Sequence, residues 1–164
     1  MLRFAAQKAG WTTPPGVSPD GAPVARGVAL CACFGSFVAQ IVEVSLSPEG
    51  RPRVHRVVAA VDCGITVNPG LAQQQIEGGI LFGLSAALYG KVSFRDGEVQ
   101  HGNFDSYPVI RMAESPRIEV HILPSVQHPG GLGEPGVPPI APAVANALFK
   151  LTGRRHRQLP LISS

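Results

Sequence analysis

A Gly- and Pro-rich segment, residues 128–139, carries one carboxylate, Glu134, directly ahead of a predicted apolar helix. The N-terminus of a helix carries about half a positive charge and several unpaired N–H groups, which favour an ionised carboxylate or an anionic ligand nearby. A carboxylate in an occluded site of this kind is suited to general-base catalysis. A surface turn with an acidic residue before a helix produces the same pattern, so these residues alone leave both interpretations open.

Three consecutive glutamines, residues 73–75, lie in the first turns of a second predicted helix, just before Gly78 and Gly79. A primary amide offers both donors and acceptors, so a Gln beside glycines suits recognition of a cofactor rich in heteroatoms. The small residues of this helix also indicate that another backbone or a ligand packs closely against it. The alternative is that all three amides are solvated on an exposed helix face.

Cys31 and Cys33 form a third candidate site, at what the pattern predicts as the start of a strand. Residues two apart on a strand face the same side, so both thiols are suited to bind a metal together with a distant His. No CxxC pair is present and the five histidines are scattered. These features favour buried structural thiols over a metal site. The odd count of three cysteines argues against a disulfide framework.

The strands that position these residues are predicted from apolar runs and turn residues. Residues 37–45 and 54–61 are largely apolar on both faces, and the Pro48-Glu49-Gly50 turn between them predicts an antiparallel hairpin with both faces buried. Shorter strands are expected at residues 91–94, 98–100, 118–123 and 158–161.

The helices are predicted from their start and stop signals. A short helix over residues 2–10 stops at Gly10. Asn68 and Pro69 are typical of a helix start, and four apolar residues then recur every four positions, namely Ile76, Ile80, Leu84 and Leu88. A further helix is expected over about residues 138–151, with Gly153 at its C-cap. The predicted fold class is α+β, with antiparallel strands and two main helices, and a Pro/Gly-rich linker over residues 12–25.

Composition limits the classes of function. The chain has 164 residues, 14 Lys and Arg against 11 Asp and Glu, and only 15% charged residues against 45% hydrophobic ones. These values exclude a coiled coil, a charged disordered tail and an electrostatically driven nucleic-acid binder. The basic residues 154–157 follow a predicted helix end, where they compensate the helix dipole. We therefore expect no nucleic-acid partner.

The compartment is not indicated by any segment of this sequence. The N-terminal residues lack the features of an export signal, and the longest uncharged run, residues 27–42, is shorter than the roughly 20 residues of a membrane span. The default expectation is a cytoplasmic protein without a membrane segment. Export to the periplasm would require a signal on a partner or on a preceding part of the protein.

Several segments together resemble a known family. Residues 61–69 (Val-Asp-Cys-Gly-Ile-Thr-Val-Asn-Pro), 75–79 (Gln-Ile-Glu-Gly-Gly) and 131–139 (Gly-Leu-Gly-Glu-Pro-Gly-Val-Pro-Pro) occur in this order. They are similar to the C-terminal part of the molybdopterin-binding large subunit of the xanthine dehydrogenase and aldehyde oxidase family. Residues 26–44 support the isoquinoline 1-oxidoreductase-type subgroup. Cys31 and Cys33 depart from the more polar residues of that subgroup.

The resemblance implies roles for individual residues. Glu134 matches the active-site glutamate that acts as general base, and Gln75, with Gly133, matches positions that bind the molybdopterin cofactor. The substrate would be an aldehyde or an N-heteroaromatic compound, oxidised with oxygen derived from water. The subgroup implies the cytosine dinucleotide form of the cofactor and electron transfer to iron–sulfur clusters on a partner subunit.

The resemblance also implies that residues 1–164 form one partial unit of a larger catalytic subunit, because family subunits are several times longer. The remainder of that subunit would supply most of the cofactor pocket, so this chain alone should not hold the cofactor. Low charge agrees with a surface that other parts cover, and we expect the isolated chain to be poorly soluble or to associate. The rival interpretations are a catalytically inactive fragment that serves as a structural or interaction module, and a small metal binder that uses Cys31 and Cys33.

Overall fold

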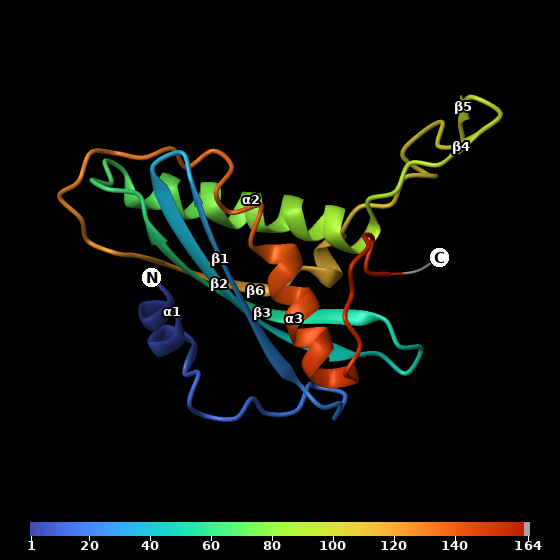
Figure 1. Cartoon of the computed structure of the whole chain (residues 1–164), viewed down its shortest axis with the longest axis horizontal. Helices are drawn as coiled ribbons and strands as arrows, with labels where there is room; N and C mark the ends of the chain where they lie inside the picture. The colour runs from blue at the N-terminus through green and yellow to red at the C-terminus, as the bar shows by residue number, and fades with distance from the viewer. Residues whose placement is uncertain (163–164) are drawn as a thin grey trace.

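The computed structural model describes residues 1–162 as an α+β fold built on one four-stranded sheet. The sheet consists of β1 (Ala25–Cys33), β2 (Ser36–Leu46), β3 (Pro52–Asp62) and β6 (Arg117–Ile122), in the order β1-β2-β3-β6 (Figure 1). The first three strands are antiparallel neighbours, which confirms the predicted hairpin. β6 pairs with β3 in parallel. This parallel pair is possible because the chain crosses over through a helix between the two strands.

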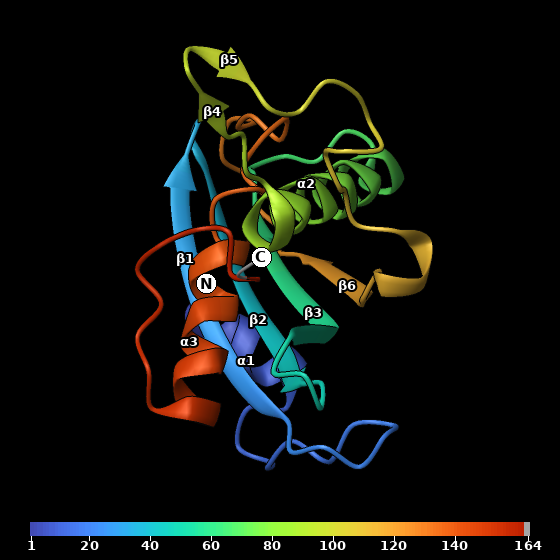
Figure 2. The ribbon, with the colours of Figure 1, turned by 90° about the vertical axis from the view of Figure 1, so that its right-hand side faces the viewer.

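Helices cover both faces of the sheet. α2 (Pro69–Tyr89) and α3 (Ile140–Thr152) lie on one face, and α1 (Leu2–Ala9) lies on the other (Figures 1 and 2). Successive β2 residues alternate between the two cores, so Val38 and Val42 pack with α2 and α3, whereas Ala39 and Ile41 pack with α1. Burial on both faces explains why these strands are apolar throughout.

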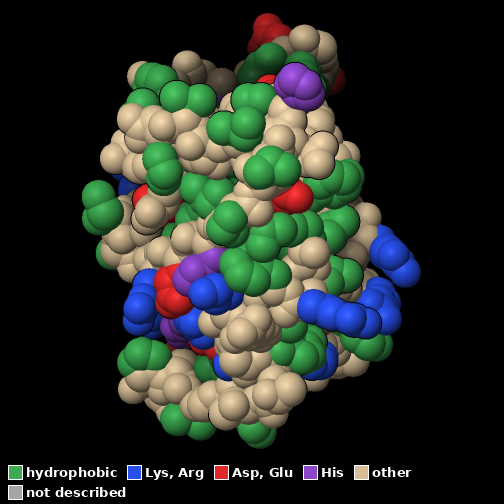
Figure 3. All heavy atoms as spheres, turned by 90° about the vertical axis from the view of Figure 1, so that its left-hand side faces the viewer, with side chains coloured by type: hydrophobic (Ala, Val, Ile, Leu, Met, Phe, Trp, Pro, Cys, Tyr) green, Lys and Arg blue, Asp and Glu red, His purple; other side chains and the backbone are tan. Residues whose placement is uncertain are grey.

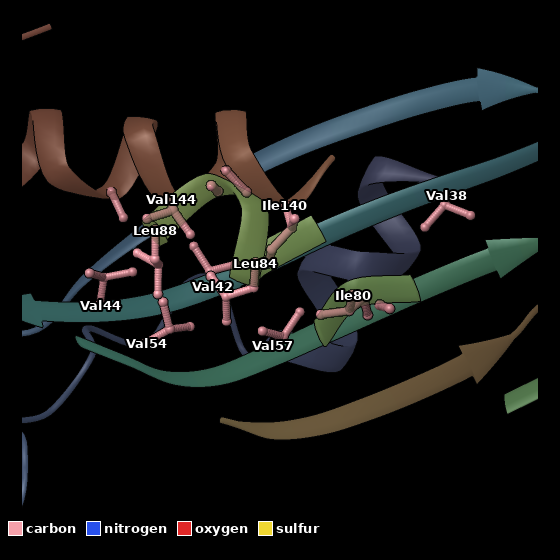
Figure 4. Packing of buried hydrophobic residues seen from close by; sticks show 14 of the residues in the cluster. Val38, Val42, Val44, Val54, Val57, Ile80, Leu84, Leu88, Ile140 and Val144 are labelled. Atoms are coloured by element: carbon pink, nitrogen blue, oxygen red, sulfur yellow. The ribbon is translucent and has the colours of Figure 1, made fainter. Parts of the chain in front are cut away.

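The α2 helix begins and packs as its sequence predicts. The Asn68 side chain accepts a hydrogen bond from the backbone N–H of Leu71, 3.1 Å away, and Pro69 occupies the first turn. The four residues of the predicted apolar ridge are all buried, namely Ile76, Ile80, Leu84 and Leu88. Figure 4 shows three of these residues, Ile80, Leu84 and Leu88, among side chains of α3 and the valines of β2 and β3.

The α3 helix ends at Gly153, whose left-handed backbone (φ 70°) satisfies the predicted C-cap. It begins at Ile140, slightly later than predicted, because Pro139 serves as its N-cap residue. Its buried residues face β1 and β2 as well as α2.

Two terminal or peripheral segments differ from the sequence expectation. The strand predicted at residues 158–161 is wrong, since Pro160 has no N–H to donate to a sheet. Leu161 instead lies buried against the end of α2, where its N–H donates to the carbonyl of Ala87 at 2.7 Å. The strands predicted at residues 91–94 and 98–100 are shorter in the structure. They form one antiparallel pair of two-residue strands, β4 (Phe94–Arg95) and β5 (Glu98–Val99), which stands away from the main sheet (Figures 1 and 2).

The segment between α1 and β1 contains no helix or strand, only one bridge between Val17 and Pro23. Arg26 holds its first part, because its guanidinium donates to the carbonyls of Gly10 at 2.8 Å and Thr13 at 2.6 Å. A 3-10 turn, η1 (Met112–Glu114), precedes β6. Within residues 1–162, no helix combines the length and the apolar character that a membrane span requires.

Candidate functional site

The loop that carries Glu134 is attached to the end of the sheet by its backbone. The N–H of Gly130 donates to the carbonyl of Cys63 at 2.8 Å, and the N–H of Gly131 donates to the carbonyl of Phe34 at 2.7 Å. A Cβ at Gly130 would lie 2.4 Å from the Ser36 hydroxyl, so only glycine fits this crossing. The loop is therefore held against the β1–β2 turn and the end of β3.

Two glutamine side chains hold the loop on either side of Glu134. Gln75, on α2, donates from Nε2 to the carbonyl of Gly133 at 2.8 Å, and Gln40, on β2, donates from Nε2 to the carbonyl of Gly136 at 2.7 Å. The N–H of Val137 donates to the Glu134 carbonyl at 2.8 Å and closes a turn over residues 134–137. The backbone around Glu134 is thus bound to two elements that are distant in sequence.

An open hollow of about 630 Å³ lies beside this loop. Glu134 supplies the only carboxylate among the described residues that line it. A Cβ at Gly78 or Gly133 would meet no atom within 4 Å, so both glycines leave free space. The hollow is lined by Cys33, Phe34, Gln75, Gly78, Gly79, Phe82, Gly133, Glu134, Val137 and Pro138. All three site residues predicted from the sequence, Gln75, Gly133 and Glu134, therefore share one hollow.

The sequence suggests an occluded carboxylate, but the residues that line this hollow are largely exposed in the structure. Glu134 and Gln75 are both exposed, and Phe34 and Phe82, which line the same hollow, are 63% and 73% exposed. The hollow is open, and it is lined by residues of the β1–β2 turn, α2 and the Glu134 loop. Figure 3 shows many hydrophobic side chains on the upper part of one face of the molecule, while Lys and Arg gather in its lower part.

The structure separates the three consecutive glutamines. Gln73 donates from its side-chain amide to Glu77 at 2.7 Å, and Gln74 is exposed, whereas Gln75 alone bonds to the Glu134 loop.

The expected close packing against the glycine side of α2 also occurs. A Cβ at Gly83 would lie 2.8 Å from the carbonyl oxygen of Val137, so the partner of this face is the backbone of the same loop.

The cysteine pair lies at the end of β1, so its predicted place at the start of a strand is wrong. The pattern was ambiguous because β1 and β2 read as one apolar run, interrupted only by the tight turn at Phe34 and Gly35. The Cys31 and Cys33 Sγ atoms are 3.5 Å apart, and both residues are half-buried free thiols. Partial burial, the adjacent Cys31 thiol and the Glu134 carboxylate raise the pKa of the Cys33 thiol. Across residues 1–162, no group of three or more metal-ligating side chains is assembled.

Sequence reasoning missed three residues of this site. Gln40 is fully buried and is the one polar residue of the apolar stretch 37–42 in β2, a signal that it has a partner inside the fold. Phe82 lies seven residues after Gln75, on the same helix face. Phe34 has a left-handed backbone (φ 53°), which is uncommon for a residue with a Cβ and holds its ring at the edge of the hollow.

Comparison with known proteins gives matches over most of the chain. The family of molybdopterin cofactor-binding domains matches residues 15–116. The beta subunit of isoquinoline 1-oxidoreductase from Brevundimonas diminuta is 38% identical over 142 residues, which are 86% of this chain and 18% of that protein. A nicotinate dehydrogenase subunit from Pseudomonas putida is 38% identical over 132 residues, 78% of this chain and 11% of that protein. The chain therefore spans less than a fifth of the length of these curated relatives.

Solved structures show the same fold. Quinoline 2-oxidoreductase from Pseudomonas putida 86 matches with a TM-score of 0.71 and 21% identity, over 77% of this chain and 17% of that chain. Aldehyde oxidoreductase from Desulfovibrio gigas matches with a TM-score of 0.66 and 22% identity, over 76% of this chain and 14% of that chain. The arrangement of sheet and helices described above thus recurs as a small part of much larger chains.

Proposed function

This chain belongs to the family of molybdopterin cofactor-binding domains, and from that premise we propose that it forms the C-terminal part of the catalytic subunit of a molybdenum hydroxylase. The substrate is an aldehyde or an N-heteroaromatic compound, which receives oxygen derived from water. Electrons leave to iron–sulfur clusters on a partner subunit, and the remainder of the molybdenum subunit completes the site. The observation that supports this proposal is the hydrogen bond from the Gln75 amide to the carbonyl of Gly133, the residue before the predicted base Glu134, with all three residues lining one hollow.

The residues that line the hollow fit a molybdopterin cofactor. Gln75 uses its Nε2 on the loop, while the described residues provide no hydrogen-bond donor to its Oε1. Gly78 and Gly133 leave space in which a planar, heteroatom-rich group can approach the backbone. We assign Gln75 and Gly133 to cofactor binding, with the cytosine dinucleotide as the expected form. The bound molybdenum centre would supply the redox and oxygen-transfer chemistry.

Glu134 is proposed as the general base. Among residues 1–162 it is the only carboxylate that lines the hollow, and the backbone on either side of it is held by Gln75 and Gln40. Bonds on both sides fix the backbone from which the Glu134 side chain projects, and positioning of the base is what proton transfer requires. Phe34 and Phe82 flank the hollow with apolar surface that excludes water once the opposite wall is present. Glu134 would then accept the proton of the water-derived oxygen.

Co-expression of this chain with the remainder of a matching subunit and its iron–sulfur partner tests the assignment. Glu134→Gln should lower kcat by about 10²- to 10⁴-fold while molybdenum content stays at the wild-type level, because only the base is lost. Gln75→Ala should lower molybdenum content, and Gln74→Ala is the matched control, since Gln74 is an exposed neighbour away from the loop.

Unchanged turnover in Glu134→Gln would refute the role of this residue as the base. Equal molybdenum content in Gln75→Ala and Gln74→Ala would refute the cofactor assignment. An assembled wild-type complex that binds no molybdenum would contradict the proposal and favour the rival interpretation as a structural or interaction module.

A further inference from the structure

We infer that Cys31 and Cys33 form a dithiol site that binds a thiophilic atom through two thiolates. Trivalent arsenic is the ligand class that this site fits. The two Sγ atoms are 3.5 Å apart, and both cysteines are free and half-buried. Cys33 also lines the hollow that contains Glu134. The pair therefore lies where a bound centre still meets solvent. This inference does not depend on the proposed function.

The backbone holds the two sulfur atoms on one side of the sheet. Cys31 pairs with Val38 and Cys33 pairs with Ser36 in the β1–β2 ladder, so both side chains leave the same face of β1. The turn that follows is tight, and its Phe34 carbonyl accepts a hydrogen bond from Gly131 at 2.7 Å. The dithiol is therefore preorganised, and binding of a bridging atom requires little ordering of the chain.

The separation of the sulfur atoms fits a single bridging atom. Metal–thiolate bonds are about 2.3 Å long, so two such bonds that span 3.5 Å meet at an angle of roughly 100°. This angle is close to that of a pyramidal, three-coordinate centre. The third position would then belong to a group that the ligand brings with it.

The surroundings limit the ligand to one that needs only two thiolates. Cys63 is 2% exposed, and its Sγ lies 3.3 Å from the Thr66 hydroxyl, so it serves a separate structural role. No third metal-ligating side chain joins the pair within residues 1–162. A structural zinc ion takes four protein ligands, which this pair does not offer.

An organoarsenic oxide, RAs=O, matches these requirements and its reaction is balanced. The two thiols each exchange an S–H bond for an As–S bond, and the oxide leaves as one molecule of water. Arsenic remains trivalent and both sulfur atoms remain in the thiolate oxidation state, so no oxidant or reductant is needed.

Phenylarsine oxide added to the full chain, followed by mass spectrometry under native conditions, tests the site. We expect one adduct per chain that survives excess 2-mercaptoethanol and is removed by 2,3-dimercaptopropanol. Cys31→Ser and Cys33→Ser should each weaken binding by about a hundredfold or more, because the second bond forms at the high effective concentration of a tethered thiol. Cys63→Ser, the matched control, should bind like the wild type.

Three results would overturn the inference. Wild-type affinity in either Cys31→Ser or Cys33→Ser would show that two thiols are not required. Loss of the adduct in Cys63→Ser alone would assign it to another site. An adduct that 2-mercaptoethanol removes would indicate a single sulfur bond. Far-UV circular dichroism of each variant shows that the fold is retained, and since no molybdenum is present, failure here leaves the role of Glu134 unaffected.

Discussion

Replacement of Gln40 by Glu should make folding strongly dependent on pH. Gln40 is fully buried on the α2–α3 side of β2, and its amide donates to the Gly136 carbonyl at 2.7 Å. Its Oε1 has no hydrogen-bond partner among residues 1–162. A carboxylic acid at this position can donate its O–H to Gly136 as the amide does. A carboxylate at this position would be a buried charge that faces a carbonyl oxygen, without a donor.

The sign and size of the effect follow from proton linkage. Burial without a partner raises the pKa of the new carboxyl in the folded state above its unfolded value of about 4.3. Its contribution to stability is therefore full below about pH 4.3 and is lost as the pH rises toward the folded pKa. The slope is about 1.4 kcal/mol per pH unit, so Gln40→Glu should lose roughly 2.7 kcal/mol relative to the wild type between pH 5 and pH 7.

Urea unfolding followed by circular dichroism at pH 5, 6 and 7 measures this loss. Burial lowers the pKa of His55 and His121, so the wild type itself gains some stability over this range and must be measured in parallel. Gln74→Glu, on the exposed face of α2, is the matched control and should follow the wild type. A Gln40→Glu curve parallel to that of the wild type would refute the argument that this side chain is buried against the Glu134 loop.

Other substitutions test the remaining contacts of the fold. Gly83→Ala should destabilise the chain by about 1–2 kcal/mol despite its better helix propensity, because its Cβ would lie 2.8 Å from a loop carbonyl. Gly78→Ala, with no atom within 4 Å, should stabilise it by about 0.5–1 kcal/mol, and an opposite order of the two melting temperatures would contradict this packing. The Arg56 guanidinium lowers the pKa of Glu119, so this pair contributes stability above about pH 4.3 that is lost as the pH falls. Glu119→Gln should therefore cost up to about 1 kcal/mol at pH 7 and almost nothing at pH 3 in urea titrations, whereas an equal loss at both pH values would exclude an ionic contribution. Asn68→Ala should cost about 1 kcal/mol through the lost N-cap, and a midpoint of urea unfolding like that of the wild type would show that the cap does not contribute.

Local signals in the sequence were sufficient for the three helices and for β2, β3 and β6, but not for β1. Asn68 and Pro69 mark the start of α2, Gly153 marks the end of α3, and the apolar runs of β2 and β3 are recognisable without any tertiary information. These signals act over a few residues, through capping bonds, backbone torsions and the period of the hydrophobic pattern. The same locality explains the two errors near Cys33 and Pro160. A two-residue turn inside an apolar run, and a short apolar segment that packs on a helix end, both look like strand in sequence.

For the candidate site, too, some features are recognisable in the sequence and others depend on tertiary packing. Its residue types and their order, Gln75 before Gly133 and Glu134, are present in the sequence, and their resemblance to a family suggested what they do. Only the tertiary structure decided which of three glutamines reaches the loop, that Gln40 holds the loop from within the core, and that Glu134 is exposed on the described chain. These contacts join residues 58 and 96 positions apart. They depend on how α2, β2 and the loop pack together, which no short-range pattern encodes.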